Sequence, residues 1–241
     1  MSEASAQKNG GGRIRPPEGE AESLFERFPW LYAFCRDHLF RDDTKLMANT
    51  LWPAGAPATR SSLLELGCGP GFYSRRLAGI FGQLRVVGVD RSERQLRRAR
   101  HLAATDSLSN CVFERGDARA LPMPDASFDA LVISRLFIVL PERDRVLAEM
   151  HRVLKPGGRC FIAEPRSALR AAVPLRAMWL LAGLSAPFSF GERLGSYLEP
   201  GKVSVMSAGD FEDVVESQPW SYTRRWQDTW YQYAVCEKDA G

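Results

Sequence analysis

The chain has 241 residues, of which 45% are hydrophobic and 25% charged, and its formal net charge at pH 7 is +3. This composition suffices for the core of one large domain or of a domain with a lid, and so small a charge does not indicate nucleic-acid binding. The five cysteines are scattered without a C-x-x-C pair, so we expect reduced thiols, no metal site and a cytoplasmic protein.

The N-terminal part of the chain divides into two segments of different composition. Residues 1–20 are mostly small, polar or charged and contain no apolar stretch, which predicts a disordered tail and no signal peptide. Residues 21–56 contain many aromatic side chains, and most of this segment is predicted to be helical. The segment either packs on the edge of the core or forms a helical lid over a binding site.

A short apolar run, Leu63–Leu66, is followed by a glycine-rich turn and then by apolar residues at helical spacing. The turn has the pattern G-x-G-x-G, formed by Gly67, Gly69 and Gly71. Glycine lets the backbone turn sharply and approach a ligand closely, because it has no Cβ atom. In an α/β sheet, such a loop between a strand and a helix binds a nucleotide-like ligand.

Two acidic residues follow later strands of the same predicted sheet. The run Leu84–Val89 ends on Asp90, about twenty residues after the loop, where a carboxylate can accept hydrogen bonds from both hydroxyls of a ribose. The strand predicted for Cys111–Arg115 ends in Gly116 and Asp117. This second carboxylate lies at the carboxyl edge of the sheet, where it could accept a hydrogen bond from the amino group of an adenine.

These motifs resemble those of the class I S-adenosylmethionine-dependent methyltransferases, and in particular the type 11 subgroup of quinone, sterol and natural-product methyltransferases. The matching segments, in the order and spacing of the family, are Glu65–Gly71, Val89–Asp90, Gly116–Ala118, Leu121–Asp129 and Glu149–Gly158. The resemblance covers roughly residues 60–165.

The resemblance implies a fold and a set of contacts to S-adenosylmethionine. The fold is α/β: a Rossmann-like, doubly wound, seven-stranded and mostly parallel sheet with an antiparallel terminal hairpin. In the family, the glycine loop holds the methionine part, the acidic residue after the second strand holds the ribose, and the Gly-Asp after the third strand holds the adenine. The cofactor-binding residues expected here are Glu65, Gly67, Cys68, Gly69, Gly71, Asp90, Arg91, Asp117, Ala118 and Ser134. In many related enzymes an aromatic N-terminal helix covers the site and a tyrosine touches the cofactor, which favours the lid and makes Tyr32 a candidate.

A nicotinamide-dependent dehydrogenase is the other class that uses a glycine-rich loop. That class requires the spacing G-x-G-x-x-G, which seats a pyrophosphate on a helix N-terminus. Here Phe72 occupies the position of the last glycine, followed by Tyr73 and Ser74. The spacing therefore disfavours a loop for a diphosphate, and the resemblance implies a loop that holds an amino acid.

The carboxyl ends of the fourth and fifth predicted strands, Phe128–Ile133 and Arg159–Ala163, decide the chemistry. Ser134 and Arg135 follow the fourth strand in place of the Asn/Asp-Pro-Pro-Tyr-like motif of enzymes that methylate adenine or glutamine nitrogens. Arg135 either binds an acidic substrate, steadies a developing oxyanion, or forms a lid salt bridge. Glu164 follows the fifth strand and is a candidate substrate contact. The candidate catalytic residues are Arg135, Glu164, Tyr32 and His38, and the sequence singles out no base among them.

Residues 166–206 interrupt the alternation of strands and helices before the predicted terminal hairpin. Segment 166–190 combines apolar residues with arginines and is predicted to be mostly helical. It is a cap over the substrate, a dimer contact, or a helix that lies on a membrane surface. Residues 57–241 are therefore expected to form the methyltransferase domain, with this cap insertion at about 166–206.

The predicted function is transfer of a methyl group from S-adenosylmethionine to an oxygen, nitrogen or carbon atom of a small-molecule or lipid-like acceptor. The alternative is a non-catalytic protein that binds S-adenosylmethionine as a partner or regulatory subunit. No nucleic-acid partner is expected, and peripheral membrane contact through 166–190 is an open alternative. The sequence leaves the acceptor and the oligomeric state open.

Overall fold

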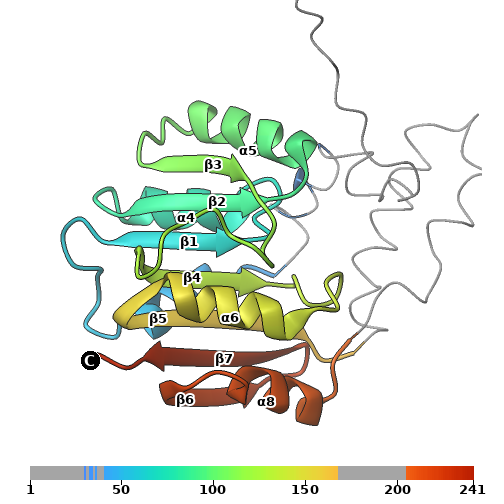
Figure 1. Cartoon of the computed structure of the whole chain (residues 1–241). Helices are drawn as coiled ribbons and strands as arrows, with labels where there is room; N and C mark the ends of the chain where they lie inside the picture. Colours follow the sequence, from blue (N-terminus) through green and yellow to red (C-terminus); the bar gives the residue numbers. More distant parts are fainter. Residues whose placement is uncertain (1–29, 31–32, 35, 37–40, 168–204) are drawn as a thin grey trace, which may run out of the picture.

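The computed structural model describes residues 30, 33–34, 36, 41–167 and 205–241, which fold around a seven-stranded sheet (Figure 1). The strands are β1 (Ser62–Leu66), β2 (Arg85–Asp90), β3 (Cys111–Arg115), β4 (Phe128–Ser134), β5 (Leu154–Pro165), β6 (Trp220–Gln227) and β7 (Tyr231–Lys238). The helices with named bounds are α3 (Thr44–Leu51), α4 (Phe72–Ile80), α5 (Glu93–Thr105), α6 (Arg143–Val153) and α8 (Ala208–Glu216).

The strands lie in the order β3-β2-β1-β4-β5-β7-β6. The first five are parallel to one another, whereas β7 is antiparallel to both β5 and β6. The expected Rossmann-like, mostly parallel sheet with an antiparallel terminal hairpin is thus confirmed. The winding direction reverses between β1 and β4, and ligands of such sheets bind beyond the carboxyl ends of the strands at this switch point.

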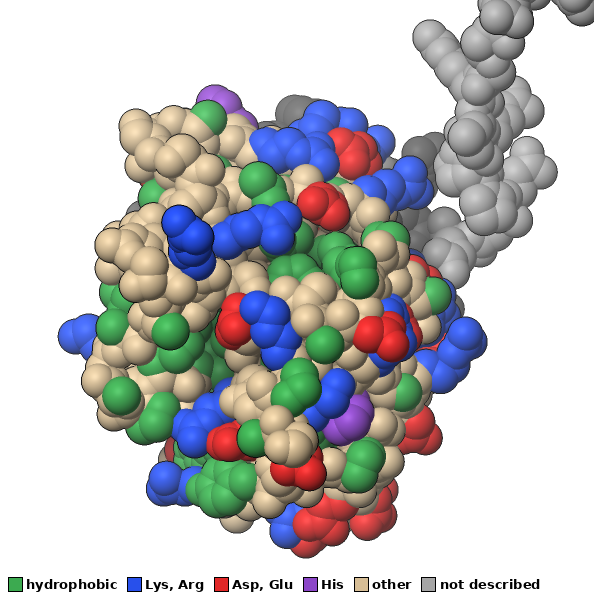
Figure 2. Space-filling model, turned by 60° about the vertical axis from the view of Figure 1, so that its left-hand side comes forward, with side chains coloured by type: hydrophobic (Ala, Val, Ile, Leu, Met, Phe, Trp, Pro, Cys, Tyr) green, Lys and Arg blue, Asp and Glu red, His purple; other side chains and the backbone are tan. Residues whose placement is uncertain are grey.

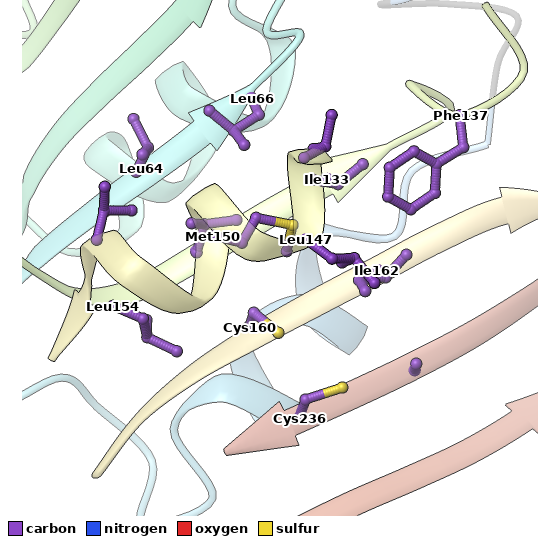
Figure 3. Close-up of a cluster of buried hydrophobic side chains, with 14 of the residues drawn as sticks. Leu64, Leu66, Ile133, Phe137, Leu147, Met150, Leu154, Cys160, Ile162 and Cys236 are labelled. Carbon is purple, nitrogen blue, oxygen red and sulfur yellow. The ribbon is translucent and has the colours of Figure 1, made fainter. Parts of the chain in front are cut away.

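Helices cover both faces of the sheet. Helices α6 and α8 pack on one face, and α3, α4 and α5 pack on the other (Figure 1). Successive strand residues point to opposite faces, so Leu64 and Leu66 of β1 belong to the first layer and Leu63 to the second. Figure 3 shows the first layer, with Leu147 and Met150 of α6 above the sheet. Because both faces are buried, the central strands are continuous apolar runs.

Two helix starts that the sequence predicts are confirmed. The Ser92 hydroxyl caps α5 by accepting the N–H of Gln95 at 3.5 Å. Ser207 and Asp210 form a reciprocal capping box at the start of α8. Both caps satisfy N–H groups of a first helical turn, which have no partner within the helix.

Two element boundaries differ from the prediction. The sequence predicts a helix over Pro141–Leu154, but α6 begins only at Arg143, because Glu142 occupies the N-cap position. Strand β5 begins earlier than predicted, at Leu154, which pairs with Phe128 across a register shift between β4 and β5. The sequence Pro156-Gly157-Gly158, which predicts a loop, is thus part of the irregular start of the strand. Glu164 accordingly lies within β5 rather than after it.

In the part of the chain that the structure describes, no helix is both long enough and apolar enough to cross a membrane. The predicted tail, most of the N-terminal lid and most of the cap insertion lie outside the described residues. The division of the chain into these segments therefore stays a prediction.

Candidate active site

Two glycines of the loop after β1 leave no room for a Cβ atom. Gly67, Gly69 and Gly71 all have left-handed backbone angles, with φ of 67°, 52° and 75°. A Cβ atom on Gly71 would lie 2.5 Å from the ring of Phe113, and one on Gly67 would lie 2.8 Å from Leu136. The fold therefore requires glycine at these two positions irrespective of a ligand.

The thiol of Cys68 lies in the core rather than at the open edge of this loop. The residue is buried, and burial raises the pKa of the thiol well above its ordinary value. Its N–H donates to the carbonyl of Val89 at 3.1 Å, which attaches the loop to β2. A cofactor contact by Cys68 stays a prediction, and it would have to involve the backbone.

The carboxylate of Asp90 joins the glycine loop to the start of α5. One oxygen accepts the N–H of Gly69 at 2.9 Å, and the other accepts the N–H of Ser92 at 2.8 Å. Two fixed backbone donors therefore orient the carboxylate at the end of β2. Arg91 follows it and is exposed.

Asp117 lies in the turn after β3 and is gripped by Arg119, a residue that the sequence analysis did not single out. The Nη2 atom of Arg119 donates to Oδ2 of Asp117 at 2.7 Å, and Nε donates to Oδ1 at 3.0 Å. The side-chain hydrogen bond from Arg119 lowers the pKa of Asp117. Ala118 lies between the two residues. The only sequence signal for this pair is that Arg119 follows Asp117 by two residues, and such a spacing is common in ordinary polar loops.

Glu65 is placed beneath the glycine loop, facing α4. Its carboxylate accepts hydrogen bonds from both the N–H and the hydroxyl of Ser74, and burial raises its pKa to about 7. These contacts hold the first turn of α4 against β1. A direct side-chain contact of Glu65 with a cofactor stays a prediction, whereas its support of the loop is observed.

The turn after β4 is built over Glu164. Arg135, just after Ser134, has a φ of 59°, which is unusual for a residue with a side chain. One oxygen of the buried Glu164 carboxyl accepts the N–H of Phe137 at 3.0 Å, and the other has no hydrogen-bond partner among the described residues. Burial raises the pKa of Glu164 to about 8. The same turn presses Leu136 against the glycine loop.

Part of the N-terminal segment closes on the helix that follows the glycine loop. The guanidinium carbon of the buried Arg36 lies 3.8 Å from the ring centroid of Phe72 and 4.5 Å from that of Tyr73. No pattern in the sequence predicts a buried arginine at this position. The candidates Tyr32 and His38 lie outside the described residues. Among the residues that are described, no three His, Cys, Asp or Glu side chains are grouped as a metal site would require.

The site therefore collects its residues from five strand ends. The glycine loop, Asp90 and Asp117 follow β1, β2 and β3, and Arg135 and Glu164 belong to the ends of β4 and β5. This arrangement offers a tight backbone loop beside two carboxylates held by fixed donors. Such a site fits an adenosine-containing ligand, because a carboxylate accepts hydrogen bonds from hydroxyl and amino groups.

Comparison with known proteins agrees with this arrangement. A family model described as a methyltransferase domain matches residues 63–158. The demethylmenaquinone methyltransferase of Deinococcus radiodurans is 34% identical over 169 residues, covering 66% of this chain and 70% of that protein. The 2-phytyl-1,4-naphtoquinone methyltransferase of Synechococcus elongatus is 35% identical over 150 residues, covering 59% of this chain and 62% of that protein.

The fold is also found among solved structures. The Haemonchus contortus phosphoethanolamine N-methyltransferase 2 in complex with S-adenosyl-L-methionine matches with a TM-score of 0.68 and 14% identity, covering 93% of this chain and 61% of that chain. At this identity the likeness concerns the fold alone. The chain spans less than two thirds of the length of several of its curated relatives.

Proposed function

This chain belongs to the class I S-adenosylmethionine-dependent methyltransferases, and from that membership we propose that it transfers a methyl group from this cofactor to a small-molecule or lipid-like acceptor. The observation that carries the proposal is the contact between Asp90 and Gly69, at 2.9 Å. It joins the two elements that would hold the ribose and the amino-acid part of the cofactor. Both elements are therefore preorganised relative to each other before a ligand binds.

In this proposal each side chain has a separate role in cofactor binding. The Asp90 carboxylate accepts hydrogen bonds from the ribose hydroxyls, and Asp117 accepts one from the adenine amino group. The backbone of Gly67, Gly69 and Gly71 approaches the methionine part, and Arg91, Ala118 and Ser134 line the edge of the site. Glu65 and Cys68 support the loop from below.

S-adenosylmethionine supplies, when bound, an electrophilic methyl group on a positively charged sulfur atom. The protein then needs chiefly to align an acceptor and to exclude water. Glu164 contributes by holding the turn after β4, and Arg135 lies at the edge where an acidic acceptor or a developing oxyanion would be stabilised. Tyr32 and His38 stay candidates for an acceptor contact or a base from the proposed lid.

The acceptor class is supported by the relatives, whose names include demethylmenaquinone and naphtoquinone methyltransferases. A nucleic-acid acceptor is not part of the proposal. On the face of the molecule that Figure 2 shows, acidic side chains lie among the lysines and arginines, whereas nucleic-acid binding uses a continuous basic surface. We also propose a cytoplasmic location. For segment 166–190 we propose a substrate cap, with a dimer contact and a membrane-facing helix as the alternatives.

The lid role of residues 21–56 is supported by Arg36, whose side chain covers the first residues of α4. A lid at this position would shield the cofactor from water, which strengthens the electrostatic interactions inside the site.

Calorimetric titration with S-adenosylmethionine and with S-adenosylhomocysteine tests the proposal. We expect both to bind, and Asp90→Asn to weaken both at least about tenfold, because a hydrogen bond to a charged group contributes about 1.5–3 kcal/mol. Asp129→Asn is the matched control, because Asp129 also accepts a backbone N–H, from Ser62 at 2.8 Å, but at the opposite edge of the sheet. If neither compound binds, the proposed function is wrong. Release of S-adenosylhomocysteine with a panel of quinones, phenols, amines and lipids then identifies the acceptor.

A further inference from the structure

Arg119 occupies a position between two loops at the carboxyl edge of the sheet. Its Nη2 and Nε atoms bind the carboxylate of Asp117, and its own N–H donates to Oδ1 of that carboxylate at 2.9 Å. Its Nη1 atom donates to Glu142, the N-cap residue of α6, at 2.7 Å. The guanidinium is thus fixed from both sides, and it fixes Asp117 in turn.

The hydrogen bonds that Asp117 accepts from the protein leave one acceptor position for a ligand. An ionised carboxylate has about four acceptor positions. Oδ1 accepts two donors from Arg119, the backbone N–H and Nε. Oδ2 accepts Nη2 at 2.7 Å, with Nε a more distant 3.2 Å away. Within the described part of the chain, Oδ2 therefore keeps room for one further N–H or O–H donor.

Asp117 is an acceptor at neutral pH, because the ordinary pKa of an aspartate, 3.8, is well below 7 and its surroundings lower it further. The hydrogen bond from Arg119 is the largest cause of its lowered pKa, and the charges of Arg119 and Arg91 act in the same direction. Glu142 faces the other side of the guanidinium and anchors it. An ionised Asp117 attracts the amino group at carbon 6 of adenine. It repels the oxygen at carbon 6 of hypoxanthine, whereas a protonated carboxyl could donate to that oxygen.

We propose that Arg119 is a positioning residue that makes the site select a 6-amino purine, by fixing the orientation of the Asp117 carboxylate and leaving one acceptor position on it. The proposal rests on the proposed function, because it takes the adenine of the cofactor to lie against Asp117. Arg119 itself does not touch the cofactor. It acts through the orientation of the carboxylate.

Calorimetry with S-adenosylhomocysteine and its inosine counterpart, S-inosylhomocysteine, tests this selection. We expect the wild-type protein to bind the adenosyl compound at least about tenfold more tightly, the effect of one hydrogen bond to a charged group. In Arg119→Met this ratio should fall several-fold, because the adenosyl compound loses affinity while the inosyl compound does not. Arg119→Lys, which keeps the charge, should restore part of the ratio.

The pH dependence of the ratio separates positioning from a structural effect. Without Arg119 the pKa of Asp117 returns toward its ordinary value of 3.8, so in Arg119→Met the ratio should fall further when the pH is lowered from about 7 to about 4. In the wild-type protein it should change less. Arg225→Met is the matched control, because Arg225 also bridges two carboxylates, Glu212 and Glu216, but on the edge strand β6.

The two proposals fail in different ways. If the wild-type protein binds neither compound, the proposed function is wrong. If it binds and selects the adenosyl compound but Arg119→Met leaves the ratio unchanged, or weakens both compounds equally, the role of Arg119 is wrong.

Discussion

Glu164 combines burial with a position at the active edge of the sheet. It accepts the N–H of Phe137 at 3.0 Å, and burial raises its pKa from 4.5 to about 8. The carboxyl group is therefore mainly protonated at neutral pH, and it holds the turn after β4 as a neutral acid. A neutral side chain suits this place, because burying a charged carboxylate costs more than burying a neutral carboxyl group.

This burial predicts a pH dependence of stability. The folded protein binds a proton at Glu164 that the unfolded chain releases above about pH 4.5, so the contribution of this residue is complete below that pH. It is lost as the pH rises to about 8, by up to a few kcal/mol. Glu164→Gln imitates the protonated form and should lack this loss. Urea unfolding of both proteins across this pH range measures the difference.

A control of opposite sign is available in Glu149. Hydrogen bonds from Arg152 lower the pKa of Glu149, so its contribution is present above its unfolded pKa and lost at acid pH. The difference between wild type and Glu149→Gln should therefore shrink as the pH falls. Parallel stability curves for wild type and Glu164→Gln would contradict the burial argument.

A second prediction concerns the glycine loop. Gly71→Ala should destabilise the fold by about 1–3 kcal/mol, because the new Cβ overlaps the ring of Phe113 and the residue has a left-handed φ. Adding Phe113→Leu should recover the steric part of this loss. Gly79→Ala is the control: it lies within α4, its nearest contact would be 3.8 Å away, and the change should stabilise by about 0.5–1 kcal/mol. Chemical denaturation measures all three variants, and an equal loss in Gly71→Ala and Gly79→Ala would exclude the steric explanation.

At the scale of elements, the capping box of α8 allows a local test. Ser207 accepts the N–H of Asp210 at 3.1 Å, and Asp210 accepts the N–H of Ser207 at 3.1 Å. Ser207→Ala should cost about 1 kcal/mol of stability. Ser217→Ala, at the other end of the helix, removes a hydroxyl that caps no first-turn N–H and should cost close to nothing. A similar loss in both variants would show that the box does not stabilise the helix.

Elements with local signals were the ones that the sequence predicted well. Strand β3 matches its predicted bounds, and α5 and α8 begin at their predicted caps. The start of β5 was missed because it depends on pairing with Phe128, across a register shift that no local pattern records. A Pro-Gly-Gly sequence then indicates a loop, although the neighbouring strand holds it in the sheet.

The candidate site, like the elements, was predicted only where a local sequence pattern marks its residues. Gly67, Gly69, Gly71, Asp90 and Asp117 follow strands at a characteristic spacing, and the parallel sheet brings them to one edge. Arg119 and Arg36 were missed because their importance depends on what the fold places beside them. An arginine in a polar loop and one in an aromatic segment look like ordinary solvated residues until their partners are known.

At the scale of the whole molecule, the site depends on the reversal of winding between β1 and β4. Helices α4 and α5 pack on one face of the sheet and α6 packs on the other. The loops before these helices therefore diverge at this point, and the carboxyl ends of the strands stay accessible to a ligand. The ligand would therefore contact loops from both halves of the sheet. Binding should stabilise the protein as a unit rather than one loop.

We therefore expect S-adenosylhomocysteine to raise the thermal unfolding midpoint of the whole domain. A ligand that binds only the folded state at about 100 times its Kd adds about 2.7 kcal/mol, which corresponds to about 5–10 °C for a protein of this size. In Asp90→Asn the shift should be largely lost, because binding is weakened. In Ser207→Ala the midpoint without ligand should fall while the shift is retained, because α8 packs away from the glycine loop. Scanning fluorimetry at several ligand concentrations measures both quantities, and a full shift in Asp90→Asn would remove Asp90 from the binding site.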